Sequence, residues 1–208
     1  MLSKNKIKYI HSLELKKNRI AERAFVAEGN KLVADMLPFF ACKLLVAKPC
    51  WMATQGDISA EELLVAEEED IRKASFLKNP QDVLAVFAMP DWQIETASPQ
   101  QDLVLALDGI QDPGNLGTII RLADWFGIEH IVCSKDTADV FNPKVVQATM
   151  GALAHVKVCY TDLETYLTAC RKQSIPVYGT FLDGENMYDR TISSRGVIVM
   201  GNEGNGIR

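Results

Sequence analysis

A polar turn between two apolar segments is the first feature of this 208-residue chain that could do chemistry. Residues 105–127 read LALDGIQDPGNLGTIIRLADWFG: an apolar stretch typical of a buried strand, then Asp-Pro-Gly-Asn, then a helical pattern. Pro113 restricts the turn, and Asn115 is predicted to cap the helix that begins there. Apolar residues then recur at helical spacing, namely Leu116, Ile119, Ile120, Ala123 and Phe126.

Arg121 lies off this apolar stripe, so its guanidinium is free to enter a crevice beyond the end of the strand. Ligands of open parallel sheets bind in such crevices, outside the carboxyl ends of the strands. The alternative is an ordinary surface arginine that pairs with Asp124, three residues further along the same helix. The turn that precedes the helix favours the functional interpretation.

A glycine-rich loop near the end of the sequence is the second candidate. In VIVMGNEGNGIR (197–208) a buried strand leads directly to Gly201, Gly204 and Gly206, which surround Glu203. Such glycines let a ligand approach the backbone, and they are expected to leave amide N–H groups free to bind it. The spacing differs from G-x-G-x-x-G, which argues against a dinucleotide site. A plain turn rich in Gly and Asn is the alternative.

A third stretch, FNPKVVQATMGALAHVKV (141–158), joins a helix begun by a proline to a corner of small residues, Met150-Gly151-Ala152. Small residues at this corner favour close packing against another helix or subunit over direct ligand contact. The sequence shows no Ser/His/Asp order, no paired carboxylates and no cluster of metal ligands, so we expect no metal.

Strands and helices alternate in two blocks around these stretches. The first block has a helix at 3–17, a strand and helix joined at Gly29-Asn30 with Asn30 as N-cap, and strands at 42–47, 63–66 and 82–89. It predicts an α/β layer domain over residues 1–92. Residues 90–101, with Pro90, Pro99 and polar residues, break the pattern, and the linker is placed within them at 93–101. The strands of the second block, 102–208, are almost continuously apolar, which indicates a parallel sheet buried on both faces.

Charge and cysteine content narrow the class of protein. The net charge is −5, yet residues 1–31 hold eight Lys or Arg against three Glu. This basic segment is either a surface for RNA phosphates or a solvated helix face. Five scattered cysteines without a C-x-x-C pair predict reduced thiols in a cytoplasmic protein. With no run of 18 apolar residues, we expect no membrane span.

Taken in order, these motifs resemble a known enzyme family. DPGNLGTIIRLADWFG and VIVMGNEGNGI, about 80 residues apart, look like the first two motifs of the SpoU (TrmH-like) RNA ribose 2′-O-methyltransferases of the SPOUT superfamily. VVQATMGAL resembles the Ser/Thr-x-Gly-Ala corner of that family. The first half, with FVAEGNKLV, is similar to an L30e-like substrate-binding domain. The resemblance covers essentially the whole chain.

The resemblance implies a parallel sheet with a trefoil knot, the cofactor S-adenosylmethionine, an RNA substrate (tRNA or rRNA) and a homodimer with the active site at the subunit interface. It implies that Arg121 stabilises the developing alkoxide while Asn115 and Glu203 hold its guanidinium by hydrogen bonds. The implied cofactor contacts are Gly201, through its backbone, with Asn202, Gly204 and Thr180. The expected RNA contacts are Arg19 and Lys31.

One departure leaves the function open at this stage. Members of the family continue past the second motif into a third, whereas this sequence stops at Arg208. We therefore expect a C-terminally truncated catalytic domain with an incomplete knot, most simply a fragment of a longer chain. The alternatives are an RNA-binding protein of the same fold without catalysis, and a dinucleotide-dependent enzyme.

Overall fold

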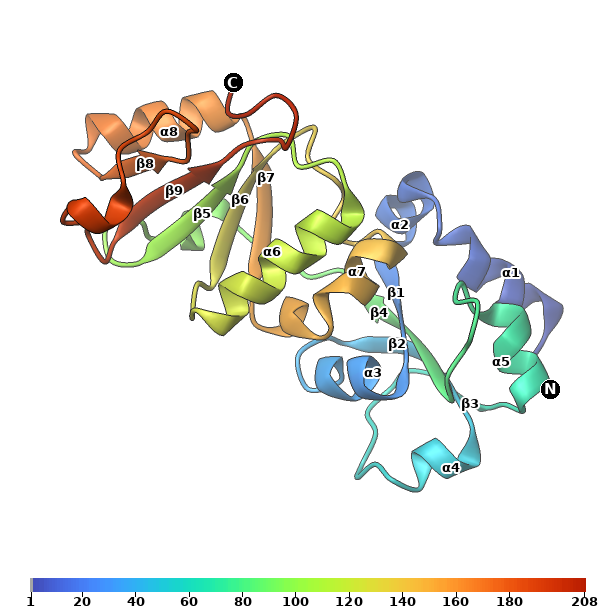
Figure 1. Cartoon of the computed structure of the whole chain (residues 1–208). Coiled ribbons are helices and arrows are strands. Elements are labelled where there is room, and N and C mark those ends of the chain that lie inside the picture. Colours follow the sequence, from blue (N-terminus) through green and yellow to red (C-terminus); the bar gives the residue numbers. More distant parts are fainter. Residues whose placement is uncertain (1) are drawn as a thin grey trace. The chain divides into compact units, whose positions relative to one another are not determined.

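The computed structural model describes residues 2–208, which pack as two compact units. Unit 1 holds the chain up to Pro90 together with Asp139–Ala154, and unit 2 holds Asp91–Ala138 and His155–Arg208 (Figure 1). The segment 139–154 therefore packs with the first half of the chain, although it lies within the second. The domain limits expected at residues 92 and 102 stay a prediction.

The sheet of unit 1 has the strand order β1-β4-β2-β3. β4 is antiparallel to both of its neighbours, and β2 is parallel to β3. The strands are β1 (Ala24–Glu28), β2 (Cys42–Ala47), β3 (Leu63–Val65) and β4 (Val83–Ala88). The helices are α1 (Lys4–Ser12), α2 (Lys16–Glu22), α3 (Asn30–Met36), α4 (Pro49–Met52), α5 (Glu68–Ala74) and α7 (Pro143–Thr149), with a 3-10 turn η2 (Ala152–Ala154).

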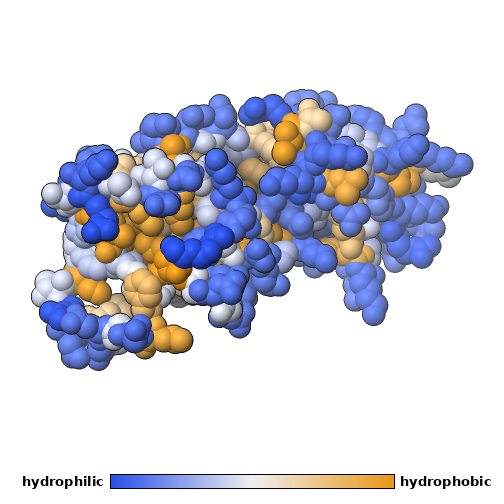
Figure 2. Space-filling view, turned by 90° about the horizontal axis from the view of Figure 1, so that it is seen from above, coloured by the Kyte–Doolittle hydropathy of each residue, from blue (hydrophilic) through white to orange (hydrophobic). Residues whose placement is uncertain are grey.

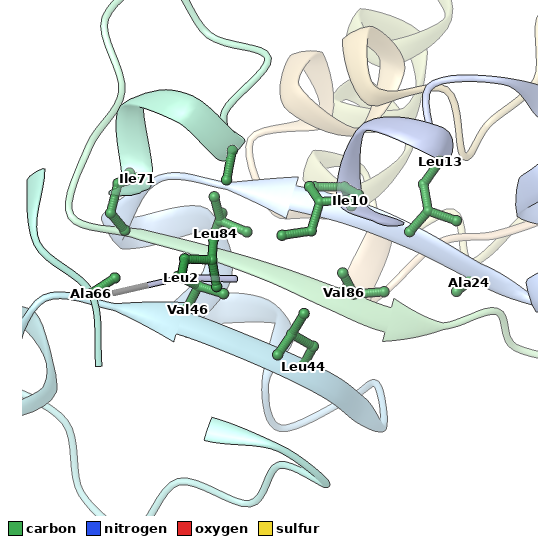
Figure 3. Packing of buried hydrophobic residues seen from close by; sticks show 12 residues of the cluster. Leu2, Ile10, Leu13, Ala24, Leu44, Val46, Ala66, Ile71, Leu84 and Val86 are labelled. Atoms are coloured by element: carbon green, nitrogen blue, oxygen red, sulfur yellow. The ribbon is translucent and has the colours of Figure 1, made fainter. Parts of the chain in front are cut away.

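Both faces of this sheet are covered, because successive side chains of a strand point to opposite faces. On one face, α1 and α5 pack against Leu44 and Val46 of β2 and against Leu84 and Val86 of β4 (Figure 3). On the other face, Phe25 and Phe87 form an aromatic cluster that Phe40 and Phe141 complete. The first block is thus an α/β layer structure, as predicted.

Two local predictions for unit 1 were wrong. The helix expected over 3–17 is broken into α1 and α2, because the carbonyls of Leu13 and Glu14 accept hydrogen bonds from the Arg19 guanidinium. Asn30 is not the N-cap of α3: Gly29 holds that position. The Asn30 side chain instead binds Asp82, at its backbone N–H and at its carboxylate.

Arg19 is the polar centre of unit 1. Its side chain is only 2% exposed, and Nη2 donates to Asp139 Oδ2 at 2.6 Å. Arg19 thus connects three segments: α2, to which it belongs, the turn that follows α1, and the start of segment 139–154. At the other end of the segment, the Gly151 backbone packs so closely on Asp35 that a Cβ there would lie 2.9 Å from Asp35 Oδ2. Residues far apart in sequence therefore build unit 1 jointly.

The sheet of unit 2 has the order β7-β6-β5-β9-β8, and each neighbouring pair is parallel. This confirms the parallel sheet predicted for the second block. The strands are β5 (Leu103–Leu107), β6 (His130–Ser134), β7 (Lys157–Thr161), β8 (Val177–Gly179) and β9 (Gly196–Met200). The helices are α6 (Pro113–Trp125) and α8 (Leu163–Lys172), with 3-10 turns η1 (Ile94–Thr96) and η3 (Met187–Asp189).

The stretch expected to be a linker, 93–101, is part of the packing of unit 2. Ile94 and Ala97 contact the apolar core of that unit, and Thr96 Oγ1 lies 3.2 Å from His130 Nε2. Two prolines and polar residues thus mark a change of unit here without marking an unpacked connection. Within residues 2–208 the longest apolar helices are too short to cross a bilayer.

Replacing Arg19 by Met should destabilise unit 1 by about 3 kcal/mol, because it leaves the mostly buried Asp139 carboxylate without its charged partner and with only the Phe141 N–H to bind it. The measurement is amide hydrogen exchange of β1 and β4 as a function of urea concentration. Arg72→Met is the matched control, since Arg72 is exposed and pairs with Glu69 on the surface of α5. Equal, small effects of both substitutions would contradict the role given to Arg19.

Candidate active site

The turn that follows β5 is built as a helix start. Asp112 is the N-cap of α6, and its Oδ1 accepts from the Asn115 N–H at 2.8 Å. Pro113 occupies the first turn of the helix, where no N–H is needed. The prediction that Asn115 caps α6 was therefore wrong: the N-cap lies three residues earlier, at Asp112. The correction matters because it leaves the Asn115 side-chain amide free for another partner.

The loop after β9 closes on itself. Asn202 N–H donates to Gly206 O, and Gly206 N–H donates to Asn202 O, both at 2.9 Å. Asn202 Oδ1 also accepts the N–H groups of Gly204 and Asn205, at 2.9 and 3.2 Å. The expectation that glycines leave these N–H groups free for a ligand was wrong, because the loop itself uses the amides of residues 202, 204, 205 and 206.

Gly201 is a glycine because of packing within the loop. A Cβ at this position would lie 2.1 Å from the carbonyl carbon of Gly206 and 2.4 Å from the nitrogen of Ile207. Any side chain would push the two arms of the loop apart. The absence of a side chain is thus explained without a ligand, and a backbone contact of Gly201 with a cofactor stays a prediction.

The two motifs meet at one edge of the sheet. β5 and β9 are parallel neighbours in register from Leu103↔Gly196 to Leu107↔Met200, so their carboxyl ends coincide. β6 and β7 lie on one side of β5 while β9 and β8 lie on the other, which makes this pair the switch point of the sheet. Asn115 Nδ2 lies 3.5 Å from Glu203 Oε2. The structure therefore brings together two of the three residues expected to be catalytic.

Arg121, the third, is on the surface of α6 and has no hydrogen-bond or ion-pair partner among residues 2–208. The hydrogen bonds expected from Asn115 and Glu203 to its guanidinium are absent. Nor does Arg121 pair with Asp124, whose carboxylate lies 3.0 Å from His155 Nδ1. The guanidinium is thus available to a partner outside this chain.

Thr180, expected to contact the cofactor, follows β8 directly. Its N–H and its Oγ1 both donate to Val199 O, at 3.1 and 3.2 Å, which continues the pairing of β8 with β9. The side chain is exposed at the same carboxyl edge as the glycine-rich loop. Its cofactor contact stays a prediction.

A cavity of about 1260 Å³ opens at this edge of unit 2. On the left of Figure 2, the side that unit 2 occupies, apolar surface is exposed between polar residues. α8 and the ends of β8 and β9 supply an apolar wall of Leu163, Leu167, Ile175, Val177, Phe181, Val199 and Ile207. Charged side chains of both signs line it too: the carboxylates of Asp108, Asp136, Asp162 and Glu164, and the cations of Lys135, Arg171 and Arg208.

The cavity touches neighbours of the expected cofactor residues rather than the residues themselves. Gly179, Val199 and Ile207 line it, whereas Thr180, Gly201, Asn202 and Gly204 are not among its lining residues. The residues that line the cavity are therefore close in sequence to the expected cofactor residues, but sequence reasoning did not select them.

Asp108 and Asp136 are the site residues that sequence reasoning missed. Arg208 binds Asp108 through its backbone N–H at 2.7 Å and through Nη2 at 2.7 Å, and Nη2 also reaches Asp136. The Arg208 guanidinium, followed by the Ser134 hydroxyl, holds the pKa of Asp136 below its usual range. The signal was present in LALD and CSKD, where a carboxylate comes at or shortly after the end of a buried strand.

The two residues expected to bind RNA have different surroundings in unit 1. Arg19 is 1% exposed and bonded to the chain itself, so the expected contact with RNA was wrong. Lys31 is on the surface of α3, with a side chain 79% exposed, and pairs with Asp35 one turn further on. Its contact with RNA stays a prediction. Within residues 2–208 no group of three His, Cys, Asp or Glu side chains is arranged to hold a metal ion.

Two family profiles match this chain. The SpoU rRNA Methylase family matches residues 102–208, and the MRM3-like substrate binding domain matches residues 4–85. The first match covers just over half of the chain and includes both motifs at the switch point.

Named relatives agree with these profiles. The chain is 31% identical over 205 residues to the 23S rRNA (guanosine(2553)-2′-O)-methyltransferase RlmP of Bacillus subtilis, covering 97% of this chain and 81% of that protein. It is 35% identical over 144 residues to the mouse mitochondrial rRNA methyltransferase 3, of which it spans about a third, 34%.

Solved structures share the whole fold. A TrmH-family protein from Porphyromonas gingivalis is 43% identical with a TM-score of 0.93, covering 100% of this chain and 84% of that one. An AdoMet-bound rRNA methyltransferase from Sinorhizobium meliloti is 32% identical with a TM-score of 0.82, covering 100% of this chain and 82% of that one. The chain belongs to the SpoU rRNA methylase family.

Proposed function

We propose that this chain transfers a methyl group from S-adenosylmethionine to a ribose 2′-hydroxyl of ribosomal RNA. Membership of the SpoU family and the activity in the name of RlmP support the reaction and the substrate class. The observation that carries the proposal is the contact of Asn115 with Glu203, which joins both family motifs at the switch point of the sheet. We assign the cytoplasm as the compartment, which the free thiols of all five cysteines support.

The cavity of unit 2 has the chemistry that the cofactor requires. Its apolar wall suits a purine ring, and its mixed charged rim offers Asp162 and Glu164, which are not paired with Arg208, to the ammonium group of such a ligand. When bound, S-adenosylmethionine supplies an activated methyl group on a positively charged sulfur. The cofactor contacts expected at Gly201, Asn202, Gly204 and Thr180 would lie beside this cavity, because these residues are not in its lining. We also propose that the sheet of unit 2 forms part of the trefoil knot that the family resemblance implies.

The residues of this chain have to orient the ribose and help its hydroxyl lose a proton. Arg121 cannot act as an ordinary base, because a guanidinium stays protonated at neutral pH. We assign it the stabilisation of the alkoxide that develops on the ribose oxygen as the hydroxyl proton passes to a neighbouring RNA phosphate. Its exposure and its lack of a partner within residues 2–208 leave its donors free for that oxygen or for a neighbouring phosphate. Asn115 and Glu203, which contact one another, are the polar side chains we assign to orienting the ribose.

A second copy of the chain is proposed to cover α6. This helix exposes Leu122, Trp125 and Phe126, whose exposed fractions are 49%, 84% and 73%. Large apolar side chains this exposed on one helix end are typical of an interface. Because Arg121 is on the same helix, a homodimer built on α6 would have the arginine at the subunit boundary.

The first prediction about function concerns Arg121. Arg121→Ala should lower kcat of rRNA methylation about 100-fold, because one charged donor at a developing oxyanion has that worth. Binding of S-adenosylmethionine should stay within about threefold, because the substitution removes a group that acts only on the transition state. Methylation is followed with a radiolabelled methyl donor and calorimetry gives the affinity. Arg195→Ala is the control, since Arg195 precedes β9 at the opposite edge of the sheet. Near-normal turnover by Arg121→Ala would remove Arg121 from the chemistry.

The second prediction concerns the dimer. Trp125→Glu should convert the protein from dimer to monomer in sedimentation velocity, because burying an unpaired carboxylate in an apolar contact is unfavourable. Leu15→Glu, at a half-exposed leucine of unit 1, should leave the association unchanged. A dimer that persists in Trp125→Glu would exclude α6 as the interface.

The third prediction concerns RNA binding by unit 1. Lys31→Ala should weaken binding to a fragment of 23S rRNA and reduce the slope of log K against log salt by about one, the value of a single phosphate contact. The measurement is a filter-binding titration at several salt concentrations, with the exposed Lys172→Ala of α8 as the control. An unchanged slope would show that Lys31 does not contact phosphate.

A further inference from the structure

The side chain of Asn202 holds the glycine-rich loop together and fastens it to the neighbouring strand end. Oδ1 accepts the N–H groups of Gly204 and Asn205, and Nδ2 donates to Gly109 O at 2.8 Å. The backbone of the same residue makes two hydrogen bonds with Gly206. One side chain thus links the loop after β9 to the residue that follows β5 by two positions.

The direction of the Asn202 amide follows from these partners. Two N–H donors face one end of the amide, so that end must be the oxygen; a reversed amide would set its NH2 against both donors and its oxygen against a carbonyl. Both acceptor positions of Oδ1 are then filled by the loop. Asn202 could accept a hydrogen bond from a ligand only by releasing Gly204 or Asn205.

The anchor that Asn202 grips is itself fixed. The N–H of Gly109 donates to Ser134 Oγ at 2.9 Å, and Ser134 is only 7% exposed at the end of β6. Ser134 Oγ in turn donates to Asp136 Oδ1. Asn202 therefore ties the loop to a point that β5 and β6 hold in common.

Glu203, the next residue, depends on this attachment. Its only described contact with the first motif is the 3.5 Å approach of Asn115 Nδ2, which is at the long end of hydrogen-bond distances. A displacement of the loop by a few tenths of an ångström would end it. The carboxylate has no other side-chain partner among residues 2–208 to keep it in place.

We propose that Asn202 is a positioning residue: by fastening the loop to Gly109 it holds Glu203 against Asn115, and its side chain does not bind the cofactor. This inference rests on the proposed function and assigns Asn202 a role different from the cofactor contact expected from the family resemblance. The competing possibility is that the Asn202–Gly206 backbone bonds and the packing at Gly201 hold the loop unaided.

Asn202→Asp tests the donor alone. It keeps the acceptor for Gly204 and Asn205 but sets a carboxylate oxygen against the Gly109 carbonyl. We expect kcat to fall at least about tenfold while the dissociation constant of S-adenosylmethionine changes less than about threefold. Asn205→Asp is the matched control: it adds the same charge to the same loop, at a side chain with no described bond, and should stay within about twofold of the wild type.

A double-mutant cycle separates positioning from general loosening. If Asn202 acts through Glu203, Asn202→Asp should lower kcat less than about threefold further in a Glu203→Gln background. Fully additive losses would overturn the proposal, and so would a higher dissociation constant with kcat unchanged, which would make Asn202 a ligand of the cofactor. Wild-type turnover by Asn202→Asp would show that the backbone bonds suffice.

A second measurement does not depend on turnover. The amide protons of Gly204 and Asn205 should exchange slowly in the wild type and in Asn202→Asp, and fast in Asn202→Ala, which removes their acceptor. Fast exchange in all three proteins would overturn the loop geometry and the proposal with it. A wild-type chain that methylates no rRNA fragment but shows this exchange pattern would refute the proposed function and leave the anchoring of the loop supported.

Discussion

The pairing of β5 with β9 is the constraint on which the candidate site depends. These strands are separated by almost the whole of unit 2 in sequence, yet they are hydrogen-bonded in register along their full length. Because both are parallel, the turn after one and the loop after the other must emerge at the same edge. Asn115 and Glu203 meet there, beside a cavity whose wall comes from α8 and the ends of β8 and β9.

Many polar groups of the chain form hydrogen bonds and ion pairs that stabilise this edge of the sheet. Asn202 saturates its amide on the loop and on Gly109, and Arg208 bridges Asp108 and Asp136. Asp108 is 6% exposed, so its carboxylate needs such a partner to be buried at acceptable cost. Among residues 2–208 the guanidinium groups of Arg23, Arg121 and Arg171 have no partner within the chain. Of these three, Arg121 is the one on α6, the helix that begins at the first motif.

Unit 1 shows how a folded unit can be assembled from distant segments. Arg19 and Asp139 form a nearly buried ion pair, Phe141 completes an aromatic cluster with Phe25, and Gly151 packs against Asp35. The small-residue corner at 150–152, which lies in the second half of the chain, thus serves the packing of the first. A buried arginine of this kind is read from sequence as a surface charge, because nothing local distinguishes the two.

The sequence by itself determined the elements and their class. Apolar runs of strand length alternating with helical patterns predicted both α/β layers and the parallel sheet, and the order of two motifs predicted the family. These features are local, since the period of an apolar pattern can be recognised without knowing which residues it packs against. The tertiary structure alone decided which polar groups remain free. Asn115 is released because Asp112 caps α6, Asn202 is consumed by its own loop, and Arg19 is buried. Each of these outcomes depends on a hydrogen bond or a salt bridge whose geometry exists only in the folded chain, so composition and spacing could not decide it.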